Sequence, residues 1–86
     1  MRRTVLWEHP AVEDLFELMA KESRQARKVM IAVRSFGMGE SSDFKKLSDG
    51  SERWRLRTGD WRIFLRLESE FAYIAQVKNR RDAYPG

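Results

Sequence analysis

The fold is decided by one stretch, residues 53–67, which reads RWRLRTGDWRIFLRL. Up to position 57 the odd positions are basic and the even positions are apolar. After the turn signal Thr58-Gly59-Asp60 the odd positions are apolar instead. A period of two is typical of β-strands, and a short glycine-containing segment between two such runs is typical of a hairpin. The stretch therefore predicts two antiparallel strands, residues 53–57 and 61–67.

The same alternation predicts what each face of the sheet carries, because successive side chains of a strand point to opposite faces. If Trp54 and Trp61 pack inward with their apolar neighbours, the other face receives Arg53, Arg55, Arg57, Arg62 and Arg66. Between residues 53 and 67 the only acid is Asp60, in the turn. Like charges on neighbouring strands repel, so such a face is expected to bind an anionic ligand. A solvated outer face is the alternative.

Two helices are predicted before this stretch. The first begins near His9-Pro10, and its apolar face is made of Val12, Leu15, Phe16 and Met19. The second is placed between a Ser23 cap and Gly37, and its apolar face is made of Ala26, Val29, Met30 and Val33. The acids near the start of the first helix are expected to form a solvated face that matches the helix dipole; they are Glu13, Asp14 and Glu17.

Short strands complete the pattern. Thr4–Trp7 predicts an opening strand, and Phe71–Val77, after the turn Glu68-Ser69-Glu70, predicts a closing one. The expected fold class is α+β, with a short N-terminal strand, an antiparallel helical hairpin, and a three- to four-stranded antiparallel meander packed on the helices. Residues 1–86 are expected to form a single domain.

Composition narrows the range of functions. The chain has no cysteine, which excludes disulfides, thiolate zinc sites and cysteine nucleophiles, and its single histidine, His9, is expected to be a capping or surface residue. Residues 44–86 hold ten basic and six acidic side chains, which accounts for the whole net charge of +4 and favours a polyanionic partner. No apolar run approaches the roughly 20 residues that span a bilayer, so we expect no membrane partner and a cytoplasmic location.

Three segments together resemble the RelE branch of the RelE/ParE toxin superfamily. They are Lys45-Lys46-Leu47, the WRLRTGDWRIF block of residues 54–64, and the VKNRRDAY run of residues 77–84. In that family a lysine-leucine pair and a W-R-L-R-x-G-x-[YW]-R block are followed by a strand and a C-terminal V-x-x-R-x-x-x-Y element. The predicted order of elements is also similar, so the resemblance covers nearly the whole chain.

The resemblance implies a toxin of a type II toxin–antitoxin pair that acts as a ribosome-dependent endoribonuclease. Such enzymes cut mRNA in the ribosomal A site, where the 2′-hydroxyl attacks the adjacent phosphate without a metal or other cofactor. The implied partners are a cognate antitoxin protein, the ribosome and mRNA, with operator DNA bound only through the complex with the antitoxin.

Family roles carry over to this sequence by motif position. Arg53 and Arg55 match residues that activate the nucleophile and stabilise charge, Arg62 and Arg80 match arginines that hold the phosphate, and Tyr84 matches a tyrosine near the cleaved nucleotide. Further RNA contacts are expected from Lys45, Lys46, Arg57, Phe64, Arg66 and Arg81. Phe64, predicted to point outward among the arginines, would stack on a base, lie under the antitoxin, or be an ordinary exposed aromatic.

Two departures from the family pattern bear on proton transfer. Arginine stands at two positions where family members can have lysine, and Asn79 stands where some relatives have histidine. Arginine is a poor general base, which leaves Tyr84 or groups of the ribosome. Two alternatives stay open: a ParE-like inhibitor of DNA gyrase, and an attenuated relative that mainly binds its antitoxin.

Overall fold

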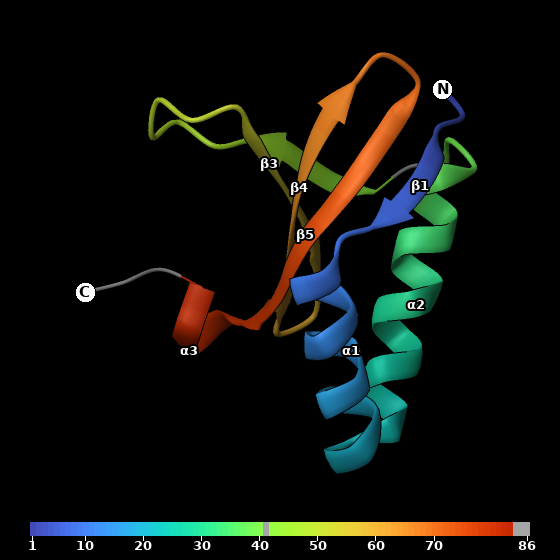
Figure 1. Ribbon diagram of the computed structural model, residues 1–86, viewed down its shortest axis with the longest axis vertical. Helices are drawn as coiled ribbons and strands as arrows, with labels where there is room; N and C mark the ends of the chain where they lie inside the picture. The colour runs from blue at the N-terminus through green and yellow to red at the C-terminus, as the bar shows by residue number, and fades with distance from the viewer. Residues whose placement is uncertain (41, 84–86) are drawn as a thin grey trace.

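The computed structural model describes residues 1–40 and 42–83 and has two layers, a sheet and a helical hairpin (Figure 1). The elements in chain order are β1 (Thr4–Trp7), α1 (His9–Lys21), α2 (Ser23–Gly37), β2 (Asp43–Lys46), β3 (Arg53–Thr58), β4 (Trp61–Glu68), β5 (Phe71–Asn79) and α3 (Arg80–Ala83). The strand order is β1-β5-β4-β3-β2, in which β2 to β5 form an antiparallel meander and β1 joins β5 in parallel. The predicted α+β class and order of elements are confirmed.

Two tight turns allow the meander to form. Gly59, between β3 and β4, has a φ of +57°, a conformation that glycine adopts without steric penalty. Ser69, between β4 and β5, has a φ of 56°, which is uncommon for a residue with a side chain. A bulge between Phe64 and Leu65 then shifts the β4–β5 register, so that Ile74 and Val77 both face the helices.

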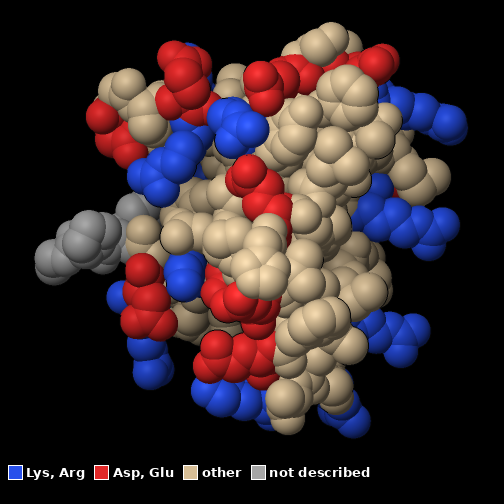
Figure 2. Space-filling model, viewed as in Figure 1, with Lys and Arg blue, Asp and Glu red and all other residues tan. Residues whose placement is uncertain are grey.

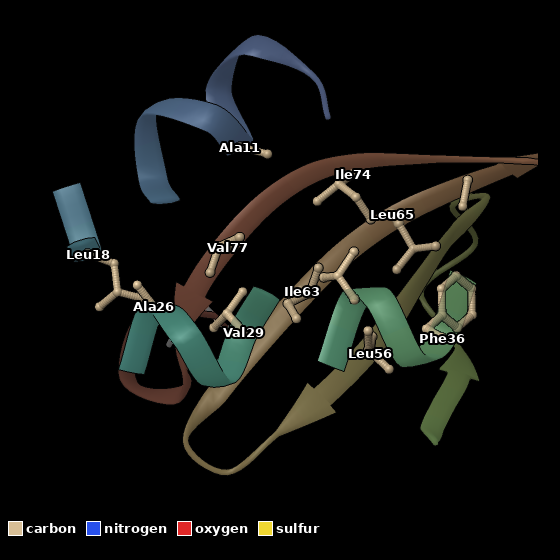
Figure 3. Packing of buried hydrophobic residues seen from close by; sticks show 12 residues of the cluster. Ala11, Leu18, Ala26, Val29, Phe36, Leu56, Ile63, Leu65, Ile74 and Val77 are labelled. Atoms are coloured by element: carbon tan, nitrogen blue, oxygen red, sulfur yellow. The ribbon is translucent and has the colours of Figure 1, made fainter. Parts of the chain in front are cut away.

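The core lies between the sheet and the helical hairpin (Figure 3). Inward-facing residues of the central strands are buried there, namely Leu56, Ile63, Leu65, Ile74 and Val77. Trp54 and Trp61 pack against this cluster, as their positions in the alternation predict. None of the helices in the described part of the chain is both long enough and apolar enough to cross a membrane.

The predicted core faces of the helices are partly wrong. In α1 the buried residues are Ala11 and Leu18, whereas Phe16 is 62% exposed and Met19 is 46% exposed. The apolar residues of α1 form two adjacent stripes, and the one that contains the small Ala11 packs on the sheet. In α2 the buried positions are Ala26, Val29, Val33 and Phe36, and Met30 remains 48% exposed.

The expected cap of α2 is also wrong. Ser23 is the first helical residue rather than the cap, the cap position belongs to Glu22, and no side chain caps the helix there. Gly37 is the last residue of α2, as predicted. The four-residue strand β2 was not predicted on its own residues, because its sequence DFKK has one apolar side chain and no clear alternation.

Candidate nucleic-acid interface

The strand register brings most of the predicted site residues together on the side of the sheet that faces away from α1 and α2, which we call the outer face. Three rows of side chains cross it. The first contains Asp43, Arg57, Arg62 and Lys78; the second contains Lys45, Arg55, Phe64 and Gln76; the third contains Arg53, Arg66, Tyr73 and Leu6. The prediction that the five arginines of β3 and β4 share one face is therefore confirmed.

The outer face is not uniformly positive, contrary to the expectation from residues 53–67. Acidic side chains from outside that stretch reach its arginines. Asp43 Oδ1 accepts a hydrogen bond from Arg55 Nη2 at 2.8 Å, and its Oδ2 lies 3.7 Å from Arg57 Nε. Asp49 Oδ2 accepts from Arg53 Nη2 at 3.1 Å. The face therefore combines arginines with acids that an incoming phosphate would have to replace.

The surroundings of Asp49, which pairs with Arg53, also change the pKa of its carboxyl group. Hydrogen bonds from the hydroxyl and backbone N–H of Ser51, with the Arg53 guanidinium beside them, lower the pKa of Asp49 to about 2. The carboxylate thus organises the loop before β3 and holds Arg53 at the start of the strand.

Arg55 has a buried donor without a partner in the described part of the chain. Its side chain is only 13% exposed, between Lys45 on β2 and Phe64 on β4. Its Nε is buried and, in the described part of the chain, has no hydrogen-bond partner. An unpaired buried donor is unfavourable, and this Nε has no contact with solvent, so an anion could contact Arg55 only through the 13% of its side chain that is exposed.

Arg62 has a different environment. It is 8% exposed, and its Nη1 donates to two backbone carbonyls, Gly59 O at 2.8 Å and Trp61 O at 3.2 Å. These bonds hold the β3–β4 turn. The guanidinium therefore contributes positive charge within the first row, but little of it is exposed for direct contact with a ligand.

The exposed position expected for Phe64 is wrong. Phe64 is on the outer face, but only 2% of it is exposed. The Arg53 guanidinium carbon lies 5.4 Å from the centroid of its ring. Phe64 therefore packs beneath the cations, where its ring has no surface for stacking on a base.

The remaining predicted residues lie at the margins. Lys45 is exposed beside Arg55, whereas Lys46 is opposite Trp54, on the other face, with its Nζ 3.5 Å from Glu52. Arg66 lies 4.7 Å from the centre of the Tyr73 ring, with Glu68 at 3.3 Å and Glu8 at 3.7 Å. Lys46 is thus separated from the outer face, and Arg66 lies in its third row.

The short helix α3 brings a further arginine to the β3–β4 turn. The backbone N–H of Arg80 donates to Asp60 O at 2.7 Å, and its side chain is 65% exposed with Nε 3.7 Å from Asp60 Oδ1. Arg81 follows in α3, exposed, with its backbone N–H bonded to Asn79 Oδ1. Arg57, Arg62 and Arg80 are thus gathered at the turn end of the sheet. Tyr84 lies outside the described residues.

Asp14 has a role that the sequence did not reveal. Instead of belonging to a solvated face, it accepts a hydrogen bond from the backbone N–H of Val77 at 2.9 Å, and its other oxygen lies 3.5 Å from Lys78 Nζ. The nine-residue strand β5 is longer than the four-residue β1 beside it, so Val77 has no partner strand on that side. Only the unequal strand lengths could have indicated this contact.

Comparisons with known proteins bear on the fold. No protein-family model matches the chain, and no curated protein matches its sequence. Among solved structures, a chain of the toxin–antitoxin complex RelBE2 from Mycobacterium tuberculosis matches with a TM-score of 0.78 and 21% identity, covering 93% of this chain and 100% of that one. The chain has the RelE-like toxin fold.

Two further structures support the RelE-like fold. The YoeB–YefM complex from Staphylococcus aureus matches with a TM-score of 0.68 and 18% identity over 91% of this chain and 97% of that one. The RelB–RelE antitoxin–toxin complex from Methanococcus jannaschii matches with a TM-score of 0.64 and 20% identity over 93% of this chain and 99% of that one. In all three, nearly the whole of both chains is aligned.

Proposed function

We propose that this RelE-like chain is the toxin of a type II toxin–antitoxin pair and cleaves mRNA on the ribosome, in the cytoplasm. The observation that carries the proposal is the strand register, which gathers five arginines of β3 and β4 on the outer face: Arg53, Arg55, Arg57, Arg62 and Arg66. The likeness to chains from toxin–antitoxin complexes supports it. The catalytic set is Arg53, Arg55, Arg62, Arg80 and Tyr84.

In the proposed reaction the 2′-oxygen of a ribose forms a bond to the adjacent phosphorus while the bond from phosphorus to the 5′-oxygen breaks. The proton of the 2′-hydroxyl passes to a base and the 5′-oxygen takes up a proton, leaving a 2′,3′-cyclic phosphate and a 5′-hydroxyl. The transition state has extra negative charge on the phosphoryl oxygens. Fixed guanidinium groups stabilise that charge without having to reorganise, by an amount of several kcal/mol.

The arginines of the described residues have different roles in binding the phosphates and stabilising this charge. The partly exposed guanidinium of Arg55 supplies positive charge to the phosphoryl group, Arg57 and the exposed Arg80 contact flanking phosphates, and the buried Arg62 adds positive charge at the turn. Arg53, which Asp49 holds in place, is proposed to contact the mRNA strand that is cleaved. Arginine does not act as the base at neutral pH, because its pKa exceeds about 12. Proton transfer is therefore assigned to Tyr84 or to the ribosome.

The proposed protein partner is an antitoxin, and operator DNA would be bound only through the complex with it. An antitoxin that covers the outer face would displace RNA by occupying the same arginines. Lys45, Arg66 and Arg81 are proposed to extend the RNA contact along the margins of this face.

A paired substitution tests the site. Arg57→Ala/Arg80→Ala removes two exposed cations, and we expect at least a tenfold fall in the rate of A-site cleavage in a reconstituted translation reaction. Lys21→Ala is the control, since Lys21 is an exposed cation outside the three rows of the outer face and its Nζ pairs with Glu17 on α1. If the double variant and the control cleaved at the same rate, the assignment of the site would be wrong.

A second candidate rests on the acids of the outer face. Asp43 and Asp49 already pair with Arg53, Arg55 and Arg57, which favours an attenuated protein that binds its antitoxin and cleaves little. This candidate predicts tight antitoxin binding together with undetectable cleavage by the unmodified chain. Inhibition of gyrase supercoiling by the purified protein would instead favour the ParE-like alternative.

A further inference from the structure

A second group of cations lies on the opposite side of the molecule from the outer face. The exposed side of α2 carries four basic residues and the start of the chain adds two more, and we call this group the α2 ridge: Arg2, Arg3, Arg24, Arg27, Lys28 and Arg34. All are exposed except the half-buried Arg3. Basic side chains follow the edge of the molecule where α2 runs (Figures 1 and 2).

Helical spacing explains why the α2 residues line up. Arg24, Arg27, Lys28 and Arg34 fall on one side of the helix, opposite the buried Val29 and Val33. At about 1.5 Å per residue, Arg24 and Arg34 are separated by about 15 Å along the axis. The side chains therefore form a row rather than a scattered set.

Arg2 and Arg3 extend this row. The backbone N–H of Arg3 donates to Gly37 O at 2.8 Å, and its guanidinium carbon lies 6.0 Å from the centre of the Phe36 ring, which brings the start of the chain to the end of α2. A hollow of about 580 Å³ opens there, lined by Arg2, Arg3 and Arg34, with Glu70 as its acid. Its three arginines make its mouth a place where a phosphate of a larger molecule could be bound.

The α2 ridge differs from the outer face in its ion pairing. In residues 1–40 and 42–83, no acid lies within ion-pair distance of any ridge residue, whereas Arg53, Arg55, Arg57, Arg66 and Arg80 all have acidic partners. The α2 sequence itself contains no acid.

Helix stability does not account for this arrangement. Cations near a helix N-terminus oppose the helix dipole, and like charges three or four residues apart repel. Arg24 lies in the first turn of α2, where it opposes the dipole, and it stands three and four residues before Arg27 and Lys28.

We propose that the α2 ridge is a second RNA-binding surface, one that contacts the phosphate backbone of folded RNA. This inference rests on the proposed function, because it assigns the outer face to the strand that is cut. The two surfaces lie on opposite sides of the two layers, so a single mRNA strand on the outer face would not reach α2. A folded RNA that surrounds the protein on both sides would reach both surfaces. Five of the six ridge residues are arginines, which bind phosphate through paired N–H donors.

This arrangement gives a physical reason for dependence on the ribosome. Phosphate contacts position a protein on nucleic acid without reading sequence, and each releases counterions and adds to the salt dependence of binding. A protein held by the ridge on folded RNA would bring its outer face to a strand that it binds weakly alone.

The test compares two charge-matched variants of the full chain. Binding to a mixed-sequence RNA duplex is measured as a function of salt for Arg27→Gln/Arg34→Gln on the ridge and Arg57→Gln/Arg80→Gln on the outer face. We expect the ridge variant to lower the slope of log K against log salt by about 1.8, from about 0.9 per phosphate contact, and the outer-face variant to change it by less than about half as much. Thermal unfolding confirms that both variants are folded.

Three results would overturn the proposal. One is an equal slope for the ridge variant and the unmodified chain. Another is tighter binding of the unmodified chain to a DNA duplex than to the RNA duplex at the same salt. The third is unchanged RNA binding with weakened binding to a co-purified antitoxin, which would make the ridge a protein contact. None of these measurements needs cleavage, so failure of the proposed nuclease activity would be seen separately.

Discussion

Arg62 makes the sharpest prediction about the outer face, because its surroundings differ from those of the other arginines. It is 8% exposed, and its Nη1 bonds to Gly59 O and Trp61 O at the β3–β4 turn. Arg62→Ala removes both bonds, and the two carbonyl oxygens can then accept hydrogen bonds only from water at the turn.

The magnitude follows from the two bonds. A hydrogen bond to a charged group contributes about 1.5–3 kcal/mol, and carbonyls at a turn recover part of that from water, so a net loss of about 2 kcal/mol is expected. A domain of 86 residues has a total free energy of unfolding of roughly 4–13 kcal/mol. The loss corresponds to a fall in Tm of about 8–16 °C.

The assay is thermal unfolding followed by circular dichroism, with Arg57→Ala as the comparison. Arg57 is about as close to the turn but is half exposed, and its ion pair with Asp43 is long, at 3.7 Å. Removing such a surface pair is expected to change stability by less than about 1 kcal/mol. Equal Tm values for the two variants would refute the structural role of Arg62. Its guanidinium would then be assigned to direct phosphate binding, like those of the other arginines.

Three further predictions follow from acidic side chains. Asp14→Ala should lower the free energy of unfolding by about 1–3 kcal/mol in urea, because Val77 N–H loses its acceptor, and Asp14→Asn should lose less because its amide oxygen still accepts; equal losses would contradict this. Asp49 should titrate by NMR with a pKa of about 2, so that its contribution to stability is present above its ordinary pKa of 3.8 and is lost as pH falls through 2, and Ser51→Ala should raise that pKa. Asp43→Asn should tighten the binding of single-stranded RNA in fluorescence anisotropy, since it removes the carboxylate charge that competes with phosphate for Arg55 and Arg57; weaker binding would show that Asp43 aligns Arg55 for RNA instead.

The sequence predicted the parts of the fold that depend on local periodicity. Alternation in residues 53–67 determined both strands and placed five arginines on one face, because a shift of one residue would have exposed Leu56, Ile63 and Leu65. The helices were harder to orient. The apolar residues of α1 fit two adjacent stripes, and only packing on the sheet selects the one with Ala11 and Leu18.

The sequence predicted which basic side chains share the outer face, but it did not predict the acidic side chains that contact the sheet. Asp43 reaches Arg55 from β2, and Asp14 reaches Val77 from α1, 63 positions away in the chain. Such contacts depend on which strands become neighbours, which the pattern within one strand does not contain. The burial of Phe64 was missed for a related reason, since Arg53, whose guanidinium lies over its ring, belongs to the neighbouring strand β3.

The central claim is tested most directly by mapping mRNA 5′ ends in a reconstituted translation reaction to which the purified protein is added, with and without ribosomes. The account predicts new 5′ ends within the A-site codon only when ribosomes are present. Unchanged 5′ ends with ribosomes present, or identical cleavage of the same mRNA without them, would contradict it.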